Sequence, residues 1–94
     1  MLKTLEDLIN IIRDRKSSSN DSSYTSKLLK DKSLSLSKVK EEIGELIEAV
    51  ENNSNKVHEA ADVLYHLLVY LEGNGVRIED IMDELEKRKK KKES

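Results

Sequence analysis

The sequence has 94 residues, which is enough for one domain with a modest core, and its formal net charge is −2. It contains no cysteine, so disulfides, thiolate metal sites and a cysteine nucleophile are excluded. It also contains no proline and only 3 glycines, while charged residues make up 38% of the chain. This composition favours helices with solvated faces, and we expect a single all-α domain over residues 1–94.

The sequence carries no pattern typical of a secretory or membrane segment. Its first residues are partly acidic and lack the apolar core of a signal peptide. The longest apolar stretch, residues 63–71, is interrupted by His66 and is too short to span a bilayer. We therefore expect a soluble, cytoplasmic protein.

Apolar residues recur at helical spacing along most of the chain, which predicts four to five helices. The expected spans are residues 2–16, 24–30, 36–51, 55–72 and a last helix that starts near residue 78. A polar loop is expected at 17–23, Ser35 or Ser37 is expected to cap the third helix, and the glycines at 73 and 75 to end the fourth. Residues 89–94 should form a frayed basic tail. Because a lone domain of this size is only marginally stable, we expect a helical bundle completed by dimerisation.

The glutamates of the third predicted helix differ in their angle to its apolar stripe. At about 100° per residue, Glu42 lies about 40° from Leu46 and Glu45 about 60° further round, so both border the interior. Glu41 and Glu48 point further from the stripe and should be more solvated. Taken alone, the four glutamates would also fit an ordinary solvated helix face. The stripe consists of Val39, Ile43, Leu46, Ile47 and Val50.

The fourth predicted helix is apolar on nearly every side between residues 60 and 71, which indicates a buried helix. Asp62 and His66 are its only strongly polar residues there, and they share one sector with Glu59. A buried, ionised aspartate costs on the order of several kcal/mol unless it is paired or bound to a metal. A salt bridge or a hydrogen bond is the alternative for Asp62. We expect His66 either to bond with Asp62 or a neighbouring helix, or to orient the Asp62 carboxylate.

Two such helices packed together would present four carboxylates across one seam, from Glu42, Glu45, Glu59 and Asp62. Oxygen-only sites suit Mg²⁺, Mn²⁺ or Ca²⁺ rather than Zn²⁺, and ligands on rigid helices argue against an EF-hand loop. Mg²⁺ commonly links carboxylates to substrate phosphates and polarises phosphoryl oxygens. The sequence therefore predicts an Mg²⁺ site, with Mn²⁺ as an alternative ion, in an enzyme that hydrolyses a nucleotide phosphoanhydride.

Basic and hydroxyl side chains elsewhere in the chain are candidates for binding the phosphates of this substrate. They are Arg15, Lys16, Tyr24, Thr25, Lys27 and Lys38. Simpler explanations remain open, since Arg15 and Lys16 also suit a helix C-terminus and Tyr24 also suits a helix start. The lysine run at 89–92 is not interleaved with aromatic residues, so nucleic-acid binding is not expected.

Two acidic motifs resemble the all-α nucleotide pyrophosphohydrolase superfamily. They are Glu41-Glu42-Ile43-Gly44-Glu45 and Glu59-Ala60-Ala61-Asp62-Val63-Leu64-Tyr65-His66. Within that superfamily the chain is most similar to the phosphoribosyl-ATP pyrophosphohydrolase family. Further features support this resemblance, namely Arg15-Lys16, Ser23-Tyr24-Thr25-Ser26-Lys27 and Lys38-Val39. The resemblance extends over nearly the whole chain.

The resemblance implies hydrolysis of phosphoribosyl-ATP between its α and β phosphates, giving phosphoribosyl-AMP and pyrophosphate in histidine biosynthesis. It implies that the four carboxylates bind Mg²⁺, that Glu41 and Glu42 are catalytic, and that the protein is a homodimer. Residues 44–49 are closer to MazG-like pyrophosphatases, which act on nucleoside triphosphates. That activity is one alternative, and a non-catalytic helical module that binds a basic partner is another.

Overall fold

The computed structural model describes residues 2–18 and 22–93, which form five α-helices and no strand. In chain order the helices are α1 (Lys3–Ser17), α2 (Tyr24–Lys30), α3 (Lys32–Glu51), α4 (Lys56–Gly73) and α5 (Ile78–Glu93). The predicted all-α class is therefore confirmed. Residues 19–21 of the predicted loop and residue 94 of the predicted tail lie outside the described residues. Helix α5 continues through the lysine run, where we expected a frayed end.

Helix α3 begins at Lys32 rather than near residue 36, because Asp31 caps it. The Oδ1 atom of Asp31 accepts a hydrogen bond from the Leu34 N–H at 3.0 Å. Ser35 is instead buried within the helix, and Ser37 is exposed on it. The prediction of a serine cap was wrong, since an aspartate earlier in the chain supplies the same capping chemistry.

The C-terminus of α4 is formed by the predicted glycine turn. Gly75 has a φ of 76°, and its N–H donates to the Glu72 carbonyl, while the Val76 N–H donates to the Leu71 carbonyl. These two bonds make a Schellman motif, in which glycine takes the left-handed conformation without strain. The motif ends α4 and turns the chain into α5.

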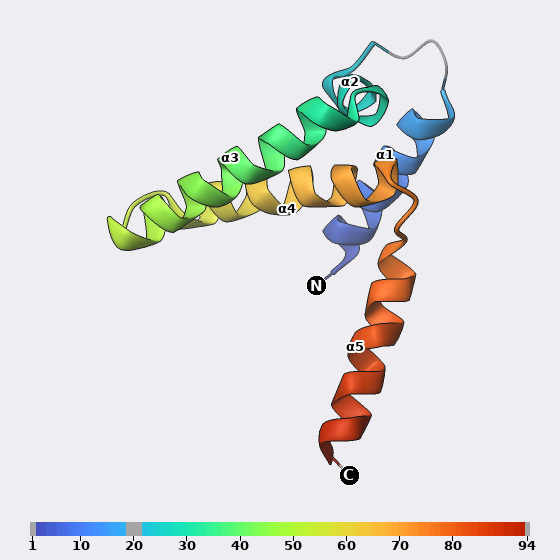
Figure 1. Cartoon of the computed structure of the whole chain (residues 1–94), viewed down its shortest axis with the longest axis vertical. Coiled ribbons are helices and arrows are strands. Elements are labelled where there is room, and N and C mark those ends of the chain that lie inside the picture. The colour runs from blue at the N-terminus through green and yellow to red at the C-terminus, as the bar shows by residue number, and fades with distance from the viewer. Residues whose placement is uncertain (1, 19–21, 94) are drawn as a thin grey trace.

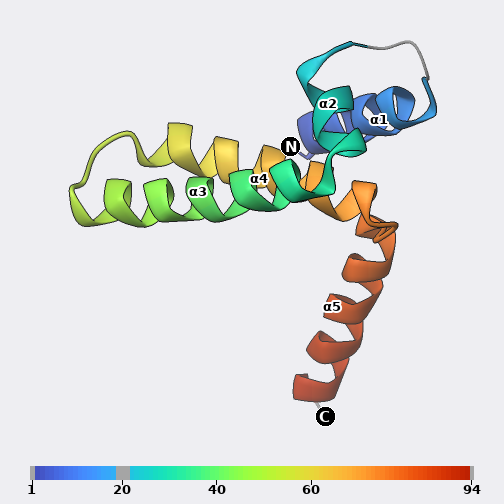
Figure 2. The ribbon, with the colours of Figure 1, turned by 45° about the horizontal axis from the view of Figure 1, so that its top comes forward.

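Helices α3 and α4 lie side by side and antiparallel as a long hairpin (Figures 1 and 2). At its tip Asn53 and Asn55 have positive φ, a conformation that asparagine tolerates better than most residues. At the opposite end α1 and α2 pack against α4, and α5 projects away from the other helices. The antiparallel pairing brings the acidic motif of α3 opposite that of α4.

The hydrophobic core lies where α1, α2 and α4 meet. Ile12 of α1, Leu28 of α2 and Val69 of α4 are almost fully buried at its centre, with Ile9 and Leu68 beside them. The spacing of the two α1 residues is the helical spacing on which the prediction of α1 rested. This core holds the start of α2 against α4.

The hairpin leaves large apolar side chains exposed, so the predictions of a buried stripe and a buried fourth helix were wrong for the single chain. On α3, Val39 is buried, but Ile43, Ile47 and Val50 are 41%, 54% and 56% exposed. On α4, Leu64 is also exposed. Two helices in a hairpin cover only one face of each other, and the remaining faces need a further partner to be buried.

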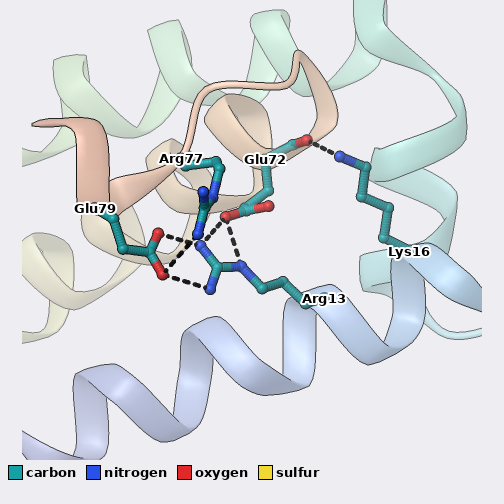
Figure 3. A network of polar contacts seen from close by, with 5 residues as sticks. All are labelled: Arg13, Lys16, Glu72, Arg77 and Glu79. Carbon is teal, nitrogen blue, oxygen red and sulfur yellow. Dashed lines mark hydrogen bonds and ion pairs between the residues drawn. The ribbon is translucent and has the colours of Figure 1, made fainter.

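A polar network joins α1 to both ends of the α4–α5 turn (Figure 3). Arg13 Nη2 lies 2.8 Å from Glu72 Oε1 and 2.6 Å from Glu79 Oε1. Lys16 Nζ donates to the Glu72 carbonyl at 2.7 Å, and Arg77 Nη2 lies 3.5 Å from Glu79 Oε2. The hydrogen bonds from Arg13 lower the pKa of Glu79 to about 2. The network fixes the direction in which α5 leaves the other helices.

Candidate metal centre

The four predicted metal ligands lie opposite one another across the α3–α4 hairpin, one pair on each helix. Carboxylate oxygens of Glu42, Glu45 and Glu59 all lie within 4.8 Å of one another. A second group with the same spacing contains Glu59, Asp62 and His58. Glu59 belongs to both groups, so the structure brings all four predicted carboxylates together around it.

Glu42 is the most buried of these carboxylates, with 8% of its surface exposed. Its Oε2 atom is buried without a hydrogen-bond partner among the described residues, and the same holds for Oε2 of Glu59. Burial and the neighbouring Glu45 carboxylate raise the pKa of Glu42, with a smaller contribution from Asp62. A buried carboxylate beside others is unfavourable unless a proton or a cation neutralises it.

Asp62 is less buried than the sequence suggested. Its side chain is 39% exposed, and its Oδ2 lies 3.4 Å from Nε2 of His58, one turn earlier on α4. The prediction of a buried Asp62 was wrong because α3 covers only part of the α4 face that carries it. His58 was not among the predicted site residues, although its spacing of four residues from Asp62 was visible in the sequence.

The chemistry of this cluster fits a hard divalent cation. Carboxylate oxygens are the ligands that Mg²⁺ and Mn²⁺ prefer, and here they sit on two packed helices. A cation would supply the missing partner for the buried oxygens of Glu42 and Glu59 and offset the repulsion among the carboxylates. A shallow hollow of about 230 Å³, lined in part by Glu45 and Glu59, gives access from solvent.

A larger hollow of about 570 Å³ lies between α1 and α5. Its walls include Leu5, Ile9, Ile78 and Met82, and none of the predicted site residues lines it. Glu6, Arg13, Glu79 and Asp83 also line it, and Arg13 and Glu79 are paired with each other there. The candidate site therefore lies at the hairpin and not in this hollow.

The start of α2 is held against α4 by two hydrogen bonds. Tyr24 Oη lies 3.0 Å from His66 Nε2, and the hydroxyls of Thr25 and Tyr65 bond to each other. The other ring nitrogen of His66, Nδ1, lies 2.8 Å from the Asp62 carbonyl oxygen. His66 thus bonds to a neighbouring helix and to the backbone of Asp62. This agrees with the expectation that His66 bonds with Asp62 or a neighbouring helix. Its ring does not orient the Asp62 carboxylate.

Lys38 and Glu41 form an ion pair at the edge of the carboxylate cluster. Nζ of Lys38 lies 3.3 Å from Oε2 of Glu41, and this hydrogen bond raises the pKa of Lys38. Glu41 is exposed, as its angle to the apolar stripe predicted. Burial raises the pKa of Tyr24, while the charge of Lys38 lowers it and that of Glu42 raises it. The Tyr24 hydroxyl is connected to the backbone of Asp62 through the ring of His66.

The other predicted phosphate ligands lie elsewhere on the molecule. Lys16 donates a hydrogen bond to the Glu72 carbonyl (Figure 3). At the helical rise, Glu72 is about 15 Å along α4 from Asp62. Arg15, next to it, is exposed at the end of α1, and Lys27 is exposed on α2. The structure therefore brings Tyr24 and Lys38 to the carboxylates and places Arg15 and Lys16 at the opposite end of α4.

Comparison with known proteins assigns this chain to one family. The profile of the phosphoribosyl-ATP pyrophosphohydrolase family matches residues 5–89. The chain belongs to this family. It is 44% identical over 93 residues to the phosphoribosyl-ATP pyrophosphatase of Methylobacterium nodulans, covering 90% of this chain and 82% of that protein. It is 40% identical over 94 residues to the protein of that name from Clostridium novyi, covering 96% and 84%.

A longer relative of the phosphoribosyl-ATP pyrophosphohydrolase family is found in Arabidopsis thaliana. The chain is 42% identical over 95 residues to its histidine biosynthesis bifunctional protein hisIE, chloroplastic, covering 93% of this chain and 34% of that protein. The predicted resemblance to the pyrophosphohydrolase family is therefore confirmed. Within residues 2–18 and 22–93, no helix is long and apolar enough to cross a membrane.

Proposed function

We propose that this chain hydrolyses phosphoribosyl-ATP to phosphoribosyl-AMP and pyrophosphate in histidine biosynthesis, using Mg²⁺ held by the four clustered carboxylates. The family supports the substrate, because the relatives are named for hydrolysis of phosphoribosyl-ATP. One observation supports the metal site. Glu42 and Glu59 each have a buried oxygen without a partner among the described residues, and their carboxylates lie within 4.8 Å of each other. Such oxygens favour a bound cation.

The proposed roles of the residues follow from their positions. Mg²⁺ bound by the cluster would neutralise substrate charge and polarise a phosphoryl oxygen, and Mn²⁺ has similar ligand preferences. Glu41 lies just outside the cluster and is paired with Lys38. A substrate phosphate that takes Lys38 as its partner frees the Glu41 carboxylate to accept a proton from the attacking water. Glu42, whose pKa is raised, is the second candidate for this base.

The remaining proposed substrate ligands form two groups, one on α2 and one at the end of α4 that is far from the carboxylates. Tyr24 bonds to His66, which lies one helical turn after Asp62, and Thr25 follows Tyr24 in the first turn of α2. Lys27 is exposed on the same helix. We assign Arg15 and Lys16, at the far end of α4, to parts of the substrate that are remote from the metal.

We also propose that two copies of the chain form a homodimer through the hairpin. Ile43, Ile47 and Val50 on α3 and Leu64 on α4 are large apolar residues that a single chain leaves exposed. Burying apolar surface contributes about 25 cal/mol per Å², so a partner hairpin would stabilise both copies. Two paired hairpins would form a four-helix bundle, which is a common architecture for metal sites built from facing helices.

Pyrophosphate release from phosphoribosyl-ATP tests the proposed reaction. We expect release that stops when EDTA removes divalent cations and resumes when Mg²⁺ is restored. Turnover of nucleoside triphosphates without turnover of phosphoribosyl-ATP would instead favour the MazG-like activity. A melting temperature that responds to neither Mg²⁺ nor nucleotide would favour a non-catalytic module, because a ligand that binds the native state stabilises it.

A further inference from the structure

Tyr24, His66 and Asp62 form a chain of hydrogen bonds that runs from α2 into α4. His66 is buried, and its ring meets the Tyr24 ring edge-on with centroids 5.8 Å apart. Tyr65 packs edge-on against the His66 ring and stacks with the Tyr24 ring. Tyr24 itself is 47% exposed. A fixed imidazole therefore holds a phenol that a ligand can reach from solvent.

The direction of the hydrogen bonds follows from the acceptor at one end. The Asp62 carbonyl oxygen can only accept, so Nδ1 of His66 carries a proton and donates it. In the neutral imidazole the other nitrogen, Nε2, is then an acceptor, and the Tyr24 hydroxyl donates its one proton to it. The Tyr24 oxygen is left with lone pairs only, so its next partner must be a donor.

The position of Tyr24 places it beside a nucleotide whose phosphates meet the carboxylate cluster. Asp62 is one helical turn, about 6 Å, from His66 along α4. The charges of Lys38 and Glu42 both act on the Tyr24 phenol. The Tyr24 hydroxyl lies 3.0 Å from Nε2 of His66, whose Nδ1 lies 2.8 Å from the Asp62 carbonyl oxygen, so a ligand bound at the carboxylates can extend to the phenol.

We propose that His66 is a positioning residue that presents Tyr24 as a hydrogen-bond acceptor to the nucleoside part of the bound nucleotide. Phosphoanhydride oxygens are acceptors, so they do not match an oxygen that has given its proton to His66. Ribose hydroxyls and a base amino group are the donors that a nucleotide offers. Tyr24 thus differs from the phosphate ligand that the sequence suggested. The inference rests on the proposed function, because it needs a nucleotide bound at the carboxylate cluster.

The first test compares ATP with inorganic pyrophosphate, which has phosphates but no nucleoside. Both are titrated calorimetrically in the presence of Mg²⁺ into the wild-type chain and Tyr24→Phe. We expect Tyr24→Phe to weaken ATP binding about tenfold, the effect of losing one hydrogen bond, and to change pyrophosphate binding less than about twofold. Tyr70→Phe, the same change at a tyrosine of α4, is the matched control and should leave both affinities unchanged.

A pair of variants tests the roles of the two ring nitrogens of His66 separately. His66→Asn keeps a donor near the Nδ1 position for the Asp62 carbonyl but loses the contact with Tyr24. His66→Gln keeps an acceptor near the Nε2 position for Tyr24 but loses the contact with Asp62. We expect His66→Asn to weaken ATP binding as much as Tyr24→Phe does. His66→Gln should retain most of the wild-type affinity for ATP. The double variant should bind ATP about as weakly as Tyr24→Phe alone, since both changes remove the same interaction.

A purely structural role for His66 predicts a different pattern. Tyr65→Phe removes the hydrogen bond between Thr25 of α2 and Tyr65 of α4 and leaves the bond between Tyr24 and His66 in place. If His66 only held α2 in place, Tyr65→Phe would weaken ATP binding as much as His66→Asn, and the inference would fail. If Tyr24→Phe weakened the binding of pyrophosphate as much as the binding of ATP, the inference would also fail, because the phenol would then donate to phosphate. No change in either affinity would show that Tyr24 does not contact the nucleotide.

Failure of this inference differs from failure of the proposed function. If the wild-type chain neither binds ATP nor releases pyrophosphate from phosphoribosyl-ATP, the proposed function fails and the inference fails with it. If the wild-type chain is active and Tyr24→Phe shows no selective loss of ATP binding, only the inference fails.

Discussion

Arg13 Nη2 lies 2.8 Å from Oε1 of Glu72, and this ion pair ties α1 to the last turn of α4. The Glu72 side chain is only 8% exposed, and Arg13 Nε also donates to it at 2.9 Å. Arg13→Met would leave this carboxylate buried without its cation. Because the arginine itself is partly solvated, we expect the free energy of unfolding to fall by about 2 kcal/mol, as measured by urea denaturation.

The exposed pair of Lys3 and Asp7 supplies a control for Arg13. Its atoms lie 3.3 Å apart on one face of α1, and both side chains are largely solvated. Lys3→Met should therefore lower the free energy of unfolding by less than about 0.5 kcal/mol. If Arg13→Met had as small an effect, Glu72 would not depend on the guanidinium.

The bond between Arg13 and Glu79 predicts a dependence of stability on pH. Hydrogen bonds from Arg13 lower the pKa of Glu79 to about 2, below its ordinary value of 4.5. A carboxyl with a depressed pKa in the folded state stabilises the fold above its unfolded pKa, and this contribution is lost as the pH falls from 4.5 toward 2. Glu79→Gln should therefore lower stability at neutral pH and flatten this part of the curve.

Urea denaturation at a series of pH values measures both predictions for Glu79. The loss of stability in Glu79→Gln should be modest and should become smaller at high salt, because the Glu79 side chain is 47% exposed. Glu84→Gln, which alters an exposed acid further along α5, is the comparison variant. A Glu79→Gln curve that ran parallel to the wild-type curve below pH 4.5 would show that the ion pair does not contribute.

Features that depend on a few neighbouring residues could be predicted from the sequence. Helix α2 has the predicted bounds, and Gly75 has the predicted left-handed conformation. The helical period placed both Glu42 and Glu45 next to the interior. Glu42 is buried there, but the prediction was wrong for Glu45, which is exposed. The start of α3 was missed because Asp31 and the serines that follow it have similar capping chemistry.

Features that depend on packing could not be predicted in the same way. The apolar neighbours of Asp62 indicated a buried carboxylate, but burial depends on how much of α4 the other helices cover. The bond between Tyr24 and His66 joins residues that are 42 positions apart, and no local pattern indicates it. The exposure of Ile47 likewise depends on whether a second chain covers it.

Glu42→Gln tests the proposed metal centre. Glutamine keeps the shape of the side chain but removes a charge that is buried beside Glu45. We expect the metal-free variant to be at least as stable as the wild-type chain, while the rise in melting temperature on adding Mg²⁺ disappears. Turnover of phosphoribosyl-ATP should fall at least about 100-fold, because a direct ligand is lost.

Glu51→Gln is the matched control for Glu42, since it makes the same change at an exposed position at the end of α3. It should keep both the Mg²⁺-dependent stabilisation and the activity. A Glu42→Gln chain that kept its response to Mg²⁺ would contradict the assignment of the cluster. If only the turnover were lost, Glu42 would act as the base and not as a ligand.

The proposed homodimer predicts that a charge on the exposed hairpin separates the subunits. Ile47 on α3 is 54% exposed, and Ile11 on α1 is similar at 48%. Ile47→Lys would place a charge in the interface, so we expect a folded monomer by sedimentation equilibrium and circular dichroism. Ile11→Lys makes the same change away from the hairpin and should remain dimeric. A monomeric wild-type chain, or a dimer that Ile47→Lys leaves intact, would rule out this interface.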